Sequence, residues 1–584
     1  MVTPSDYINK RFLIESEERE DKQVTVEEAV KTYVKSGMML HFSCAGTIPY
    51  GIGYEVIRQF FDKKPEFKVA TLGATNLGQL LCAADLVELF ITSYAGDVYP
   101  RPNVSSVFQR AFKRGVKIQN WSILSFISRL AAGAMGLQFL PTRSVSGSSM
   151  ADENNESFRV IDDPFGGDGK VGLVKALKPD LSIVHVWCAD RSGNAIIVPP
   201  LGDSNFGFYA SKDGVILSAE KIVSTEFIRR HASMVKIPAF IVNAVVELPF
   251  GAHPSSHFGL NGEGYSEDLD FIVKLRQAGK EEGTLRKWIE DWILGVDHNR
   301  YLEKLGANRL KSLVELRNPE SWKSEIGGKL TTISFETECN DVEKMIINAS
   351  HEIVESTIRG GHRVILAGQG VSNLAAWIST YALQDKGLSV NLLAEIGFFG
   401  YLPRPSSPFI FNKSNIPTCT MLTDSFEALG MTLHSTDSIG VLAAAQIDLE
   451  GNINDTRVGD FFLVGSGGAN DVGSNAKEIV VVVPHGPLRL VKEVTYITVP
   501  GKRVSKIVTD KAVFEKIQER MVLTKYYPLG DLSEEAIVSE ISKKTGWKLE
   551  RAETLRKMSP VTKEDVQLLR LFDPDRYFVG KIKS

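Results

Sequence analysis

The sequence lacks most of the features that mark secreted, membrane-spanning or metal-binding proteins. It has five cysteines in 584 residues, and no two of them have the C-x-x-C spacing of a zinc or redox pair. No apolar run approaches the ~18 residues that a membrane-spanning helix needs, and the amino terminus lacks the apolar core of a signal peptide. We therefore expect a cytoplasmic protein with reduced cysteines and no membrane partner.

The chain also lacks an excess of charge of either sign. Its formal net charge is −4, from 67 Lys and Arg against 71 Asp and Glu, so no nucleic-acid partner is expected. The apolar content of 43% and the charged content of 24% are those of an ordinary globular protein. At about 150 residues per domain, the length predicts about three or four domains, or two large α/β units.

Several common catalytic signatures are missing as well. There is no Walker A sequence, no H-E-x-x-H and no G-x-S-x-G. The loop Gly368–Asn373 lacks the third glycine of the dinucleotide fingerprint. These absences argue against nucleotide hydrolysis, zinc proteolysis, serine-dependent hydrolysis and a nicotinamide cofactor.

The sequence that is present predicts alternating strands and helices. Thr25 begins a capping box before a helix that Gly37 ends, and then a strand over 38–42, a small-residue loop over 43–49 and a helix over 54–61 follow. Such alternation predicts βα units with a mainly parallel sheet. The stretch 140–169 is rich in Ser, Gly, Asp and Asn, which predicts a long surface loop or flap.

The second half repeats this order. Asn340 caps a predicted helix that two glycines stop at 360–361, and a strand over 363–367, a loop over 368–372 and a helix over 374–383 follow. The motif Asp-x-x-Gly-Asn also occurs twice, beginning at Asp190 and Asp448, where each aspartate is expected to cap a turn. We therefore predict two related domains, 1–325 and 326–584, joined by a polar linker at 317–329. The charged tail from residue 531 is expected to pack as helices on the second domain.

The stretch 391–400, which reads NLLAEIGFFG, is the strongest candidate for chemistry. Apolar residues of strand length lead into Glu395, and Gly397 and Gly400 follow. A carboxylate at the carboxyl end of such a strand lies where open α/β sheets bind ligands. Glycine just after it permits a sharp turn and close approach of another molecule, for which Gly397 is the candidate. The alternative is a solvent-facing glutamate at a strand exit.

Small-residue loops at three other strand ends are candidates for binding. Gly465–Asp471 follows an apolar strand, and its glycines expose backbone N–H groups that can hold a carboxylate or a thioester oxyanion. Its alternative is a tight turn that needs positive φ. The candidate binding residues in these loops are Gly467, Gly468 and Ala469, Gly368 and Gly370, and Ser43 and Gly46. His253 is better explained as a structural loop histidine.

At these motifs the chain resembles a family I CoA-transferase with α-type and β-type halves fused. The first half resembles the α-type subunit of the glutaconate CoA-transferase branch at 189–194 and 248–254. The second half resembles the β-type subunit, because 394–400 is similar to the family's glutamate–glycine motif and 465–471 to its G-x-G-G-A-x-D loop. The chain departs from the commoner Ser and Asn at Ala394 and Ile396.

The resemblance implies two open α/β domains of the NagB/RpiA-like type, with mainly parallel sheets and the active site between them. It implies a ping-pong reaction in which Glu395 attacks an acyl-CoA and carries first the acyl group and then CoA. The partners implied are acyl-CoA and carboxylate molecules, with CoA as substrate, no cofactor and no metal. The resemblance also implies a homodimer or homotetramer.

Two other functions remain open from the sequence. An acyl-CoA hydrolase or ring-opening enzyme on the same fold would use water in place of the second carboxylate, and Glu395 would still be required. A non-catalytic CoA-binding sensor would bind without turnover, and it would tolerate replacement of Glu395. The sequence does not name the acyl group, although the α-type resemblance favours a dicarboxylic or larger acid such as glutaconate.

Overall fold

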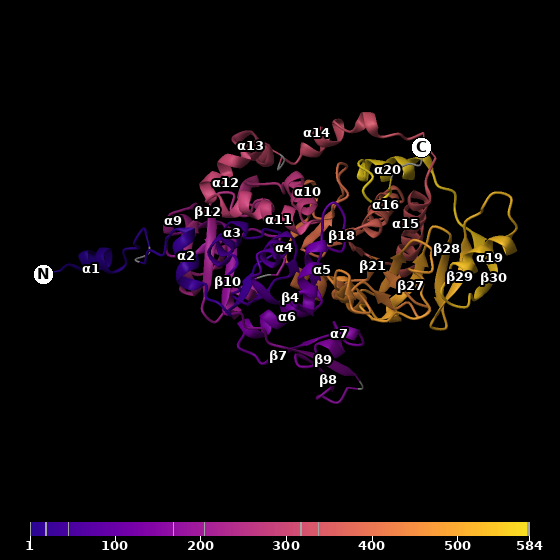
Figure 1. The fold of residues 1–584 in the computed structure, drawn as a ribbon, viewed down its shortest axis with the longest axis horizontal. Helices are drawn as coiled ribbons and strands as arrows, with labels where there is room; N and C mark the ends of the chain where they lie inside the picture. The colour runs from indigo at the N-terminus through magenta and orange to yellow at the C-terminus, as the bar shows by residue number, and fades with distance from the viewer. Residues whose placement is uncertain are drawn as a thin grey trace.

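Two large β-sheets organise the protein, one from each half of the chain (Figure 1). The computed structural model describes residues 2–17, 20–44, 46–167, 169–203, 205–315, 318–336 and 338–580. Figure 1 shows the first half, in indigo and magenta, on one side and the second half, in orange and yellow, on the other. The helices α13 (Ala307–Glu315) and α14 (Ser321–Gly327) run along one edge between the halves.

The first sheet has strand order β13-β11-β10-β1-β2-β4-β6, with β12 beside β10 and β14 beside β12. All neighbours except the pairs made by β11 are parallel. The strands are β1 (Met39–Phe42), β2 (Phe67–Ala70), β4 (Val87–Thr92), β6 (Lys117–Asn120), β10 (Leu181–Ala189), β11 (Ala195–Ile196), β12 (Val215–Ile222), β13 (Val235–Ile237) and β14 (Val242–Glu247).

The second sheet has strand order β20-β19-β18-β17-β21-β26-β27-β28-β29-β30. Its central strands β18, β17, β21, β26 and β27 are parallel. The strands are β17 (Val364–Ala367), β18 (Asn391–Ala394), β19 (Phe398–Tyr401), β20 (Met421–Leu422), β21 (Ser438–Ala443), β26 (Glu478–Val482), β27 (Val504–Val508), β28 (Ala512–Ile517), β29 (Arg520–Tyr526) and β30 (Arg551–Lys557). Both sheets are therefore the mainly parallel α/β sheets that the alternating pattern predicts.

Helices connect and cover these sheets. Those of the first half are α1 (Pro4–Arg11), α2 (Val26–Tyr33), α3 (Tyr50–Phe60), α4 (Asn76–Ala83), α5 (Ser106–Lys113), α6 (Ile123–Ala134), α7 (Ser149–Glu153), α8 (Phe206–Ala210), α9 (Thr225–Arg230), α10 (Leu269–Ala278), α11 (Glu282–Ile289) and α12 (His298–Leu305). Those of the second are α15 (Asp341–Gly360), α16 (Val371–Asp385), α17 (Leu433–Ser435), α18 (Ala469–Asn475), α19 (Glu534–Lys543) and α20 (Lys563–Phe572). Within the described ranges, we find no helix with the length and apolar character needed to span a bilayer.

The predicted starts of both paired helices are confirmed, and so is the glycine stop of the second, but α2 ends at Tyr33, before Gly37, because Val34 already has an extended backbone. Thr25 and Asn340 each accept a hydrogen bond from the backbone N–H three residues on, and each completes a capping box with a glutamate, Glu28 or Glu343. Gly361 ends α15 with φ of 64°, a conformation that glycine adopts without a steric penalty. The two halves thus begin with the same capped helix, strand, loop and helix.

One hydrophobic core joins the two halves. Ile91, Trp121 and Phe126 from the first half pack in a single cluster with Leu366 and Leu442 from the second. Each half also has a core of its own. The shared cluster packs the two halves against each other, and it includes Trp121, just after β6, and Leu393 of β18.

Two sequence expectations were wrong. The stretch 140–169, expected to be a loop or flap, contributes to a three-stranded antiparallel sheet of β7 (Phe139–Thr142), β8 (Phe158–Asp162) and β9 (Lys170–Lys175). The tail from 531 is not wholly helical, because β30 extends the second sheet beside β29. β8 pairs with β9, which follows it closely in the chain, and β30 pairs with the earlier strand β29, and composition averaged over a stretch reports neither pairing.

Candidate active site

Glu395 is the first residue after β18, at the carboxyl end of a central parallel strand. β18 lies parallel to β17, with Leu393 opposite Leu366, so the loops after both strands emerge side by side. Glu395 itself is only partly exposed, whereas Ala394 before it is fully buried. The strand therefore delivers one carboxylate to the edge of the sheet where ligands of α/β proteins bind.

Gly397 closes the turn behind this carboxylate. Its φ is 108°, and a Cβ there would lie 2.4 Å from the carbonyl oxygen of Thr423. The Gly397 carbonyl accepts a hydrogen bond of 2.9 Å from Thr423 N–H, whose own carbonyl accepts one of 3.0 Å from Leu201 N–H in the first half. Glycine is required here by conformation and by space, and the turn ties Glu395 to the junction of the two halves.

The Gly465–Asp471 loop covers the Glu395 carboxylate directly. The backbone N–H of Gly468 hydrogen-bonds to the carboxylate. A Cβ on Gly468 would lie 2.2 Å from Oε2 of Glu395, so only glycine lets the carboxylate approach this closely. The motif residue Gly468 and the motif residue Glu395 are thus brought together from positions 73 residues apart in the sequence.

Burial raises the pKa of Glu395 to about 7, and the neighbouring carboxylate of Asp471 adds to the rise, while the Gly468 hydrogen bond opposes it. Burial also raises the pKa of Asp471 to about 6, although the Leu124 N–H, 2.9 Å from its Oδ2, lowers it. The site therefore holds two interacting carboxyl groups whose charged forms are disfavoured. Such perturbed groups in one place are typical of catalytic sites.

The first half holds this loop in place. Gly467 N–H donates to the Ser93 carbonyl at 2.9 Å, and the Gly467 carbonyl accepts from Ile123 N–H at 3.1 Å. Ala469 N–H donates to the Ser466 carbonyl at 3.0 Å. Of the three predicted donors in this loop, Gly467 and Ala469 therefore use their N–H groups within the protein, and Gly468 is the one that reaches Glu395.

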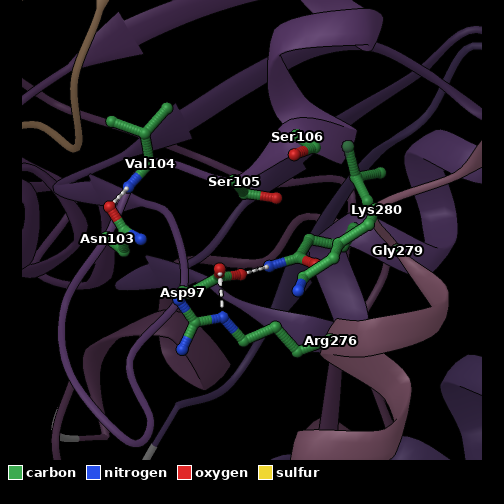
Figure 2. Close-up of a pocket in the computed structure, with 10 residues that line it drawn as sticks. Asp97, Asn103, Val104, Ser105, Ser106, Arg276, Gly279 and Lys280 are labelled. Carbon is green, nitrogen blue, oxygen red and sulfur yellow. Dashed lines mark hydrogen bonds and ion pairs between the residues drawn. The ribbon is translucent and has the colours of Figure 1, made fainter. Parts of the chain in front are cut away.

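Tyr94, in the first half, is close enough to Glu395 for the two side chains to interact electrostatically. Burial raises the pKa of Tyr94, as does the nearby charge of Asp97, and the charge of Glu395 contributes in the same direction. Figure 2 shows the cavity of about 100 Å³ behind this segment, where Arg276 Nε lies 2.7 Å from Asp97 Oδ2. Gln79 also donates to Asp97, at 3.0 Å. This ion pair anchors the segment that carries Tyr94.

The Gly368–Ser372 loop follows β17, the parallel neighbour of β18, and uses its glycines for structure. Gly368 N–H donates to the Val441 carbonyl at 3.0 Å, and Gly370 N–H caps α16 through Asn373 Oδ1 at 2.6 Å. Between them, the side-chain oxygen and nitrogen of Gln369 are buried, and neither has a hydrogen-bond partner within the described ranges. Sequence reasoning missed Gln369, although a polar residue between two loop glycines was the available signal. An unpaired buried amide is costly and calls for a polar ligand.

Ser43 and Gly46 make hydrogen bonds to other residues of the first half. Ser43 Oγ donates to Asp203 at 3.2 Å, and the Gly46 carbonyl accepts from Ser256 Oγ at 2.9 Å. In the described part of the chain, their contacts are with these residues and not with Glu395. His253 is buried between Tyr301 and Asp268, which fits the structural role expected for it.

A cleft of about 840 Å³ opens between the halves next to the Glu395 hairpin. His257 and Phe258 line it from the first half, and Lys413 and Leu422 line it from the second. Leu422 pairs with Phe398, three residues after Glu395, so the cleft adjoins the hairpin that carries the carboxylate. Lys413 Nζ lies 5.2 Å from the Phe258 ring centroid across the cleft.

Comparison with known proteins identifies the family. Residues 23–248 match the family described as coenzyme A transferase. One subunit of the glutaconate CoA-transferase of Acidaminococcus fermentans is 30% identical over 314 residues, which cover 50% of this chain and 94% of that subunit. The other subunit of the same enzyme is 27% identical over 168 residues, 24% of this chain and 59% of that subunit. An uncharacterized protein of Archaeoglobus fulgidus is 34% identical over 52% of this chain and 66% of its own length.

A crystal structure of an acyl-CoA transferase from Escherichia coli O157:H7 shares the fold, with a TM-score of 0.63 over 98% of this chain and 99% of that chain at 14% identity. The two halves of the chain are thus similar to the two subunits of that glutaconate CoA-transferase. The chain belongs to the family I CoA-transferases, a family of enzymes.

Proposed function

We propose that the protein moves CoA from an acyl-CoA to a free carboxylic acid by a ping-pong mechanism with Glu395 as nucleophile. The observation that carries this proposal is the carboxylate of Glu395, held at the junction of the halves beside the Gly468 N–H. A carboxylate whose pKa is raised to about 7 is a stronger nucleophile than an exposed one, yet a substantial fraction of it is ionised near neutral pH.

The reaction proceeds in two balanced halves. The Glu395 carboxylate attacks the thioester carbonyl and forms a C–O bond, the C–S bond breaks, and CoA leaves as a thiolate, so that a mixed anhydride of Glu395 and the acyl group remains. The thiolate then attacks the Glu395 carbonyl of that anhydride, releases the first acid as a carboxylate and leaves a glutamyl-CoA thioester. The second acid reverses both steps, which gives the new acyl-CoA and regenerates the carboxylate. No net proton is consumed.

Residues around Glu395 have distinct parts in this scheme. The Gly468 N–H stabilises the oxygen that becomes negative when the glutamyl carbonyl is attacked. The Gln369 amide, which has no hydrogen-bond partner among the residues that the structure describes, binds a polar group of the substrate. The anhydride and thioester must be shielded from water, and the close fit of the Gly468 loop over the carboxylate supports this protection.

We infer that acyl-CoA enters by the cleft next to the hairpin, with Lys413 attracting its negative charge. The similarity to the first of the two glutaconate CoA-transferase subunits supports a dicarboxylic or larger acid as the acyl group. We further propose a homodimer or homotetramer, to be tested by light scattering after gel filtration. The outward face of the β7-β9-β8 sheet, where Phe139 is 51% exposed, supports self-association.

Trapping the covalent intermediate tests the proposal. The protein is incubated with a panel of acyl-CoAs, treated with borohydride and digested, and the peptide that contains Glu395 is analysed by mass spectrometry. We expect a reduced or CoA-modified Glu395 that appears only with acyl-CoA and is absent from Glu395→Gln. A panel that leaves this peptide unmodified contradicts the mechanism. Release of free CoA without a new thioester, in the presence of acetate and other acids, would instead support a hydrolase.

A further inference from the structure

Three side chains outside the candidate active site gather on one face of the first sheet. His185 on β10 and Glu220 on β12 lie on neighbouring parallel strands, where His185 is opposite Ser218, two residues before Glu220. His257, on the short strand β15 (His257–Phe258), comes from the loop that covers this face. Their candidate ligand atoms all lie within 4.8 Å of one another.

His257 is unusual among the buried histidines that the structure describes. It is 2% exposed, and neither of its ring nitrogens has a hydrogen-bond partner. His41, His185 and His253 are buried as deeply, and each uses both nitrogens. A neutral imidazole has one donor and one acceptor, so burying both unpaired is costly unless something else occupies the space between the rings.

The other two side chains are held as metal ligands usually are. His185 Nδ1 lies 2.9 Å from Ser218 Oγ, and the Ser218 hydroxyl is directed to the Val184 carbonyl at 3.4 Å. This arrangement lets Nδ1–H donate to Ser218 and leaves the Nε2 lone pair for a metal. Such outer hydrogen bonds fix the tautomer and the orientation of a ligating histidine.

Glu220 is oriented from two sides. Its Oε2 accepts from Phe250 N–H at 2.9 Å, and its Oε1 accepts from the Tyr265 hydroxyl at 2.8 Å. Without a metal, His185 Nε2 donates to Oε1 at 2.7 Å. When a metal takes the place of the His185 proton, Oε1 keeps its hydrogen bond from Tyr265 and has its other lone pair for the ion.

We propose that His185, Glu220 and His257 bind one divalent transition-metal ion, with Zn²⁺ as the first candidate. Two imidazoles and one carboxylate are a ligand set that Zn²⁺ accepts, with water as the fourth ligand. The ion joins the loop at 250–265 to the sheet. Because His257 and Phe258 line the cleft between the halves, it also fixes one wall of that cleft. Its role is structural, and the transfer chemistry at Glu395 does not pass through it.

Metal binding is tested on the full-length chain. The protein is stripped with a chelator, reloaded with Zn²⁺ or Co²⁺ and desalted, and bound metal is measured by plasma mass spectrometry and by competition with a chromophoric chelator. We expect one ion per chain, and we expect His257→Gln to weaken binding by at least ~100-fold. The matched control is His434→Gln in α17, which should bind as the parent protein does. Zn²⁺ should also raise the melting temperature of the parent and not of His257→Gln.

X-ray absorption of the Zn²⁺-loaded parent keeps the proposal falsifiable if His257→Gln fails to fold. We expect scattering from two imidazoles and from oxygen ligands. Substoichiometric metal, equal affinity in His257→Gln and the parent, or a spectrum without imidazole scattering would overturn the proposal. In that case the three side chains form a hydrogen-bonded network alone.

Discussion

The two halves of the chain reach the same structural position with different side chains. In the first half the strand β2, beside β1, ends at Ala70 and is followed by Thr71-Leu72-Gly73. In the second half β18, beside β17, ends at Ala394 and is followed by Glu395-Ile396-Gly397. Thr71 is buried and cannot ionise at physiological pH, whereas Glu395 carries a carboxylate.

The first half instead holds the Gly465–Asp471 loop that lies against that carboxylate. Ser93 and Ile123 bind the backbone of Gly467, and Leu124 N–H binds Asp471 at 2.9 Å. The same α/β unit thus carries the proposed nucleophile in one copy and holds the neighbouring loop in place in the other. The division shows that function depends on the side chains placed at a shared position, and not on the fold that places them.

Replacing the carboxylate should give the largest effect. Glu395→Gln is expected to lower turnover by at least about 10⁴-fold, because an amide can neither attack the thioester nor carry CoA. Steady-state exchange between acyl-CoA and free acid, measured by mass spectrometry, tests this, with circular dichroism to show an intact fold.

The double variant Thr71→Glu, Glu395→Gln tests whether a glutamate at the equivalent position of the first half can replace Glu395. No activity should return, because a glutamate at that position has no Gly468 beside it. Transferase activity retained by Glu395→Gln alone would refute the assignment of the nucleophile.

Closing the space above the carboxylate should cost less. Gly468→Ala places a Cβ 2.2 Å from Glu395 Oε2, so the carboxylate or the loop must move and the N–H contact is lost. We expect kcat to fall by about 10²–10³-fold, as when an oxyanion donor is removed. Gly486→Ala is the matched control, because a Cβ there meets nothing within 4 Å. Equal activity of the two variants would show that the Gly468 contact does not matter.

Asp471→Asn should shift the pH dependence of the reaction. The nucleophile must be ionised, so kcat/KM is expected to rise with pH through the pKa of Glu395, about 7. Removing the Asp471 charge takes away one cause of the raised pKa, and the acidic limb should move to lower pH. If the acidic side of the kcat/KM profile does not move in Asp471→Asn, Asp471 is not a cause of the raised pKa of Glu395.

The same pKa has a consequence for stability. The folded pKa of Glu395 lies above its usual value of 4.5, so folding favours the protonated form. Its contribution to stability is complete below about pH 4.5 and is lost as pH rises through about 7. Glu395→Gln should therefore lose less stability than the parent over this interval in urea unfolding.

Local signals in the sequence were sufficient for much of this site. The capping boxes at Thr25 and Asn340 and the glycine stop at Gly361 depend on neighbours within a few residues, and the structure contains all three. Glu395 was found because an apolar strand, one acid and a glycine stand together. The paired motifs at Asp190 and Asp448 also form matching turns.

Contacts between residues far apart in the chain could not be predicted from the sequence. The N–H groups of Gly467 and Gly468 look equivalent in the chain, and only the position of Ser93 in the other half separates their roles. The strand β8 was missed for another reason, because it pairs locally with β9 but its polar composition is that of a loop. The Gln369 amide becomes a candidate for ligand binding only in the structure, where its polar atoms are buried and have no hydrogen-bond partner among the described residues.

The turns at Asp190 and Asp448 are alike in the two halves. Replacing their aspartates should have the smallest effect on activity among the variants considered. Asp190 Oδ1 accepts the N–H groups of Gly193 and Asn194, each at 2.9 Å. Asp448 Oδ1 accepts that of Asn452 at 2.9 Å. Replacing either aspartate with alanine leaves buried donors unpaired and should cost about 1–3 kcal/mol.

Urea unfolding of Asp190→Ala and Asp448→Ala measures these costs, with fluorescence and circular dichroism followed separately because a chain of two halves need not unfold in one step. We expect similar losses, since the two turns are built alike, and little change in kcat. If one variant instead lost activity while keeping its stability, that turn would belong to the site, and the two halves would differ in more than the residue after the strand.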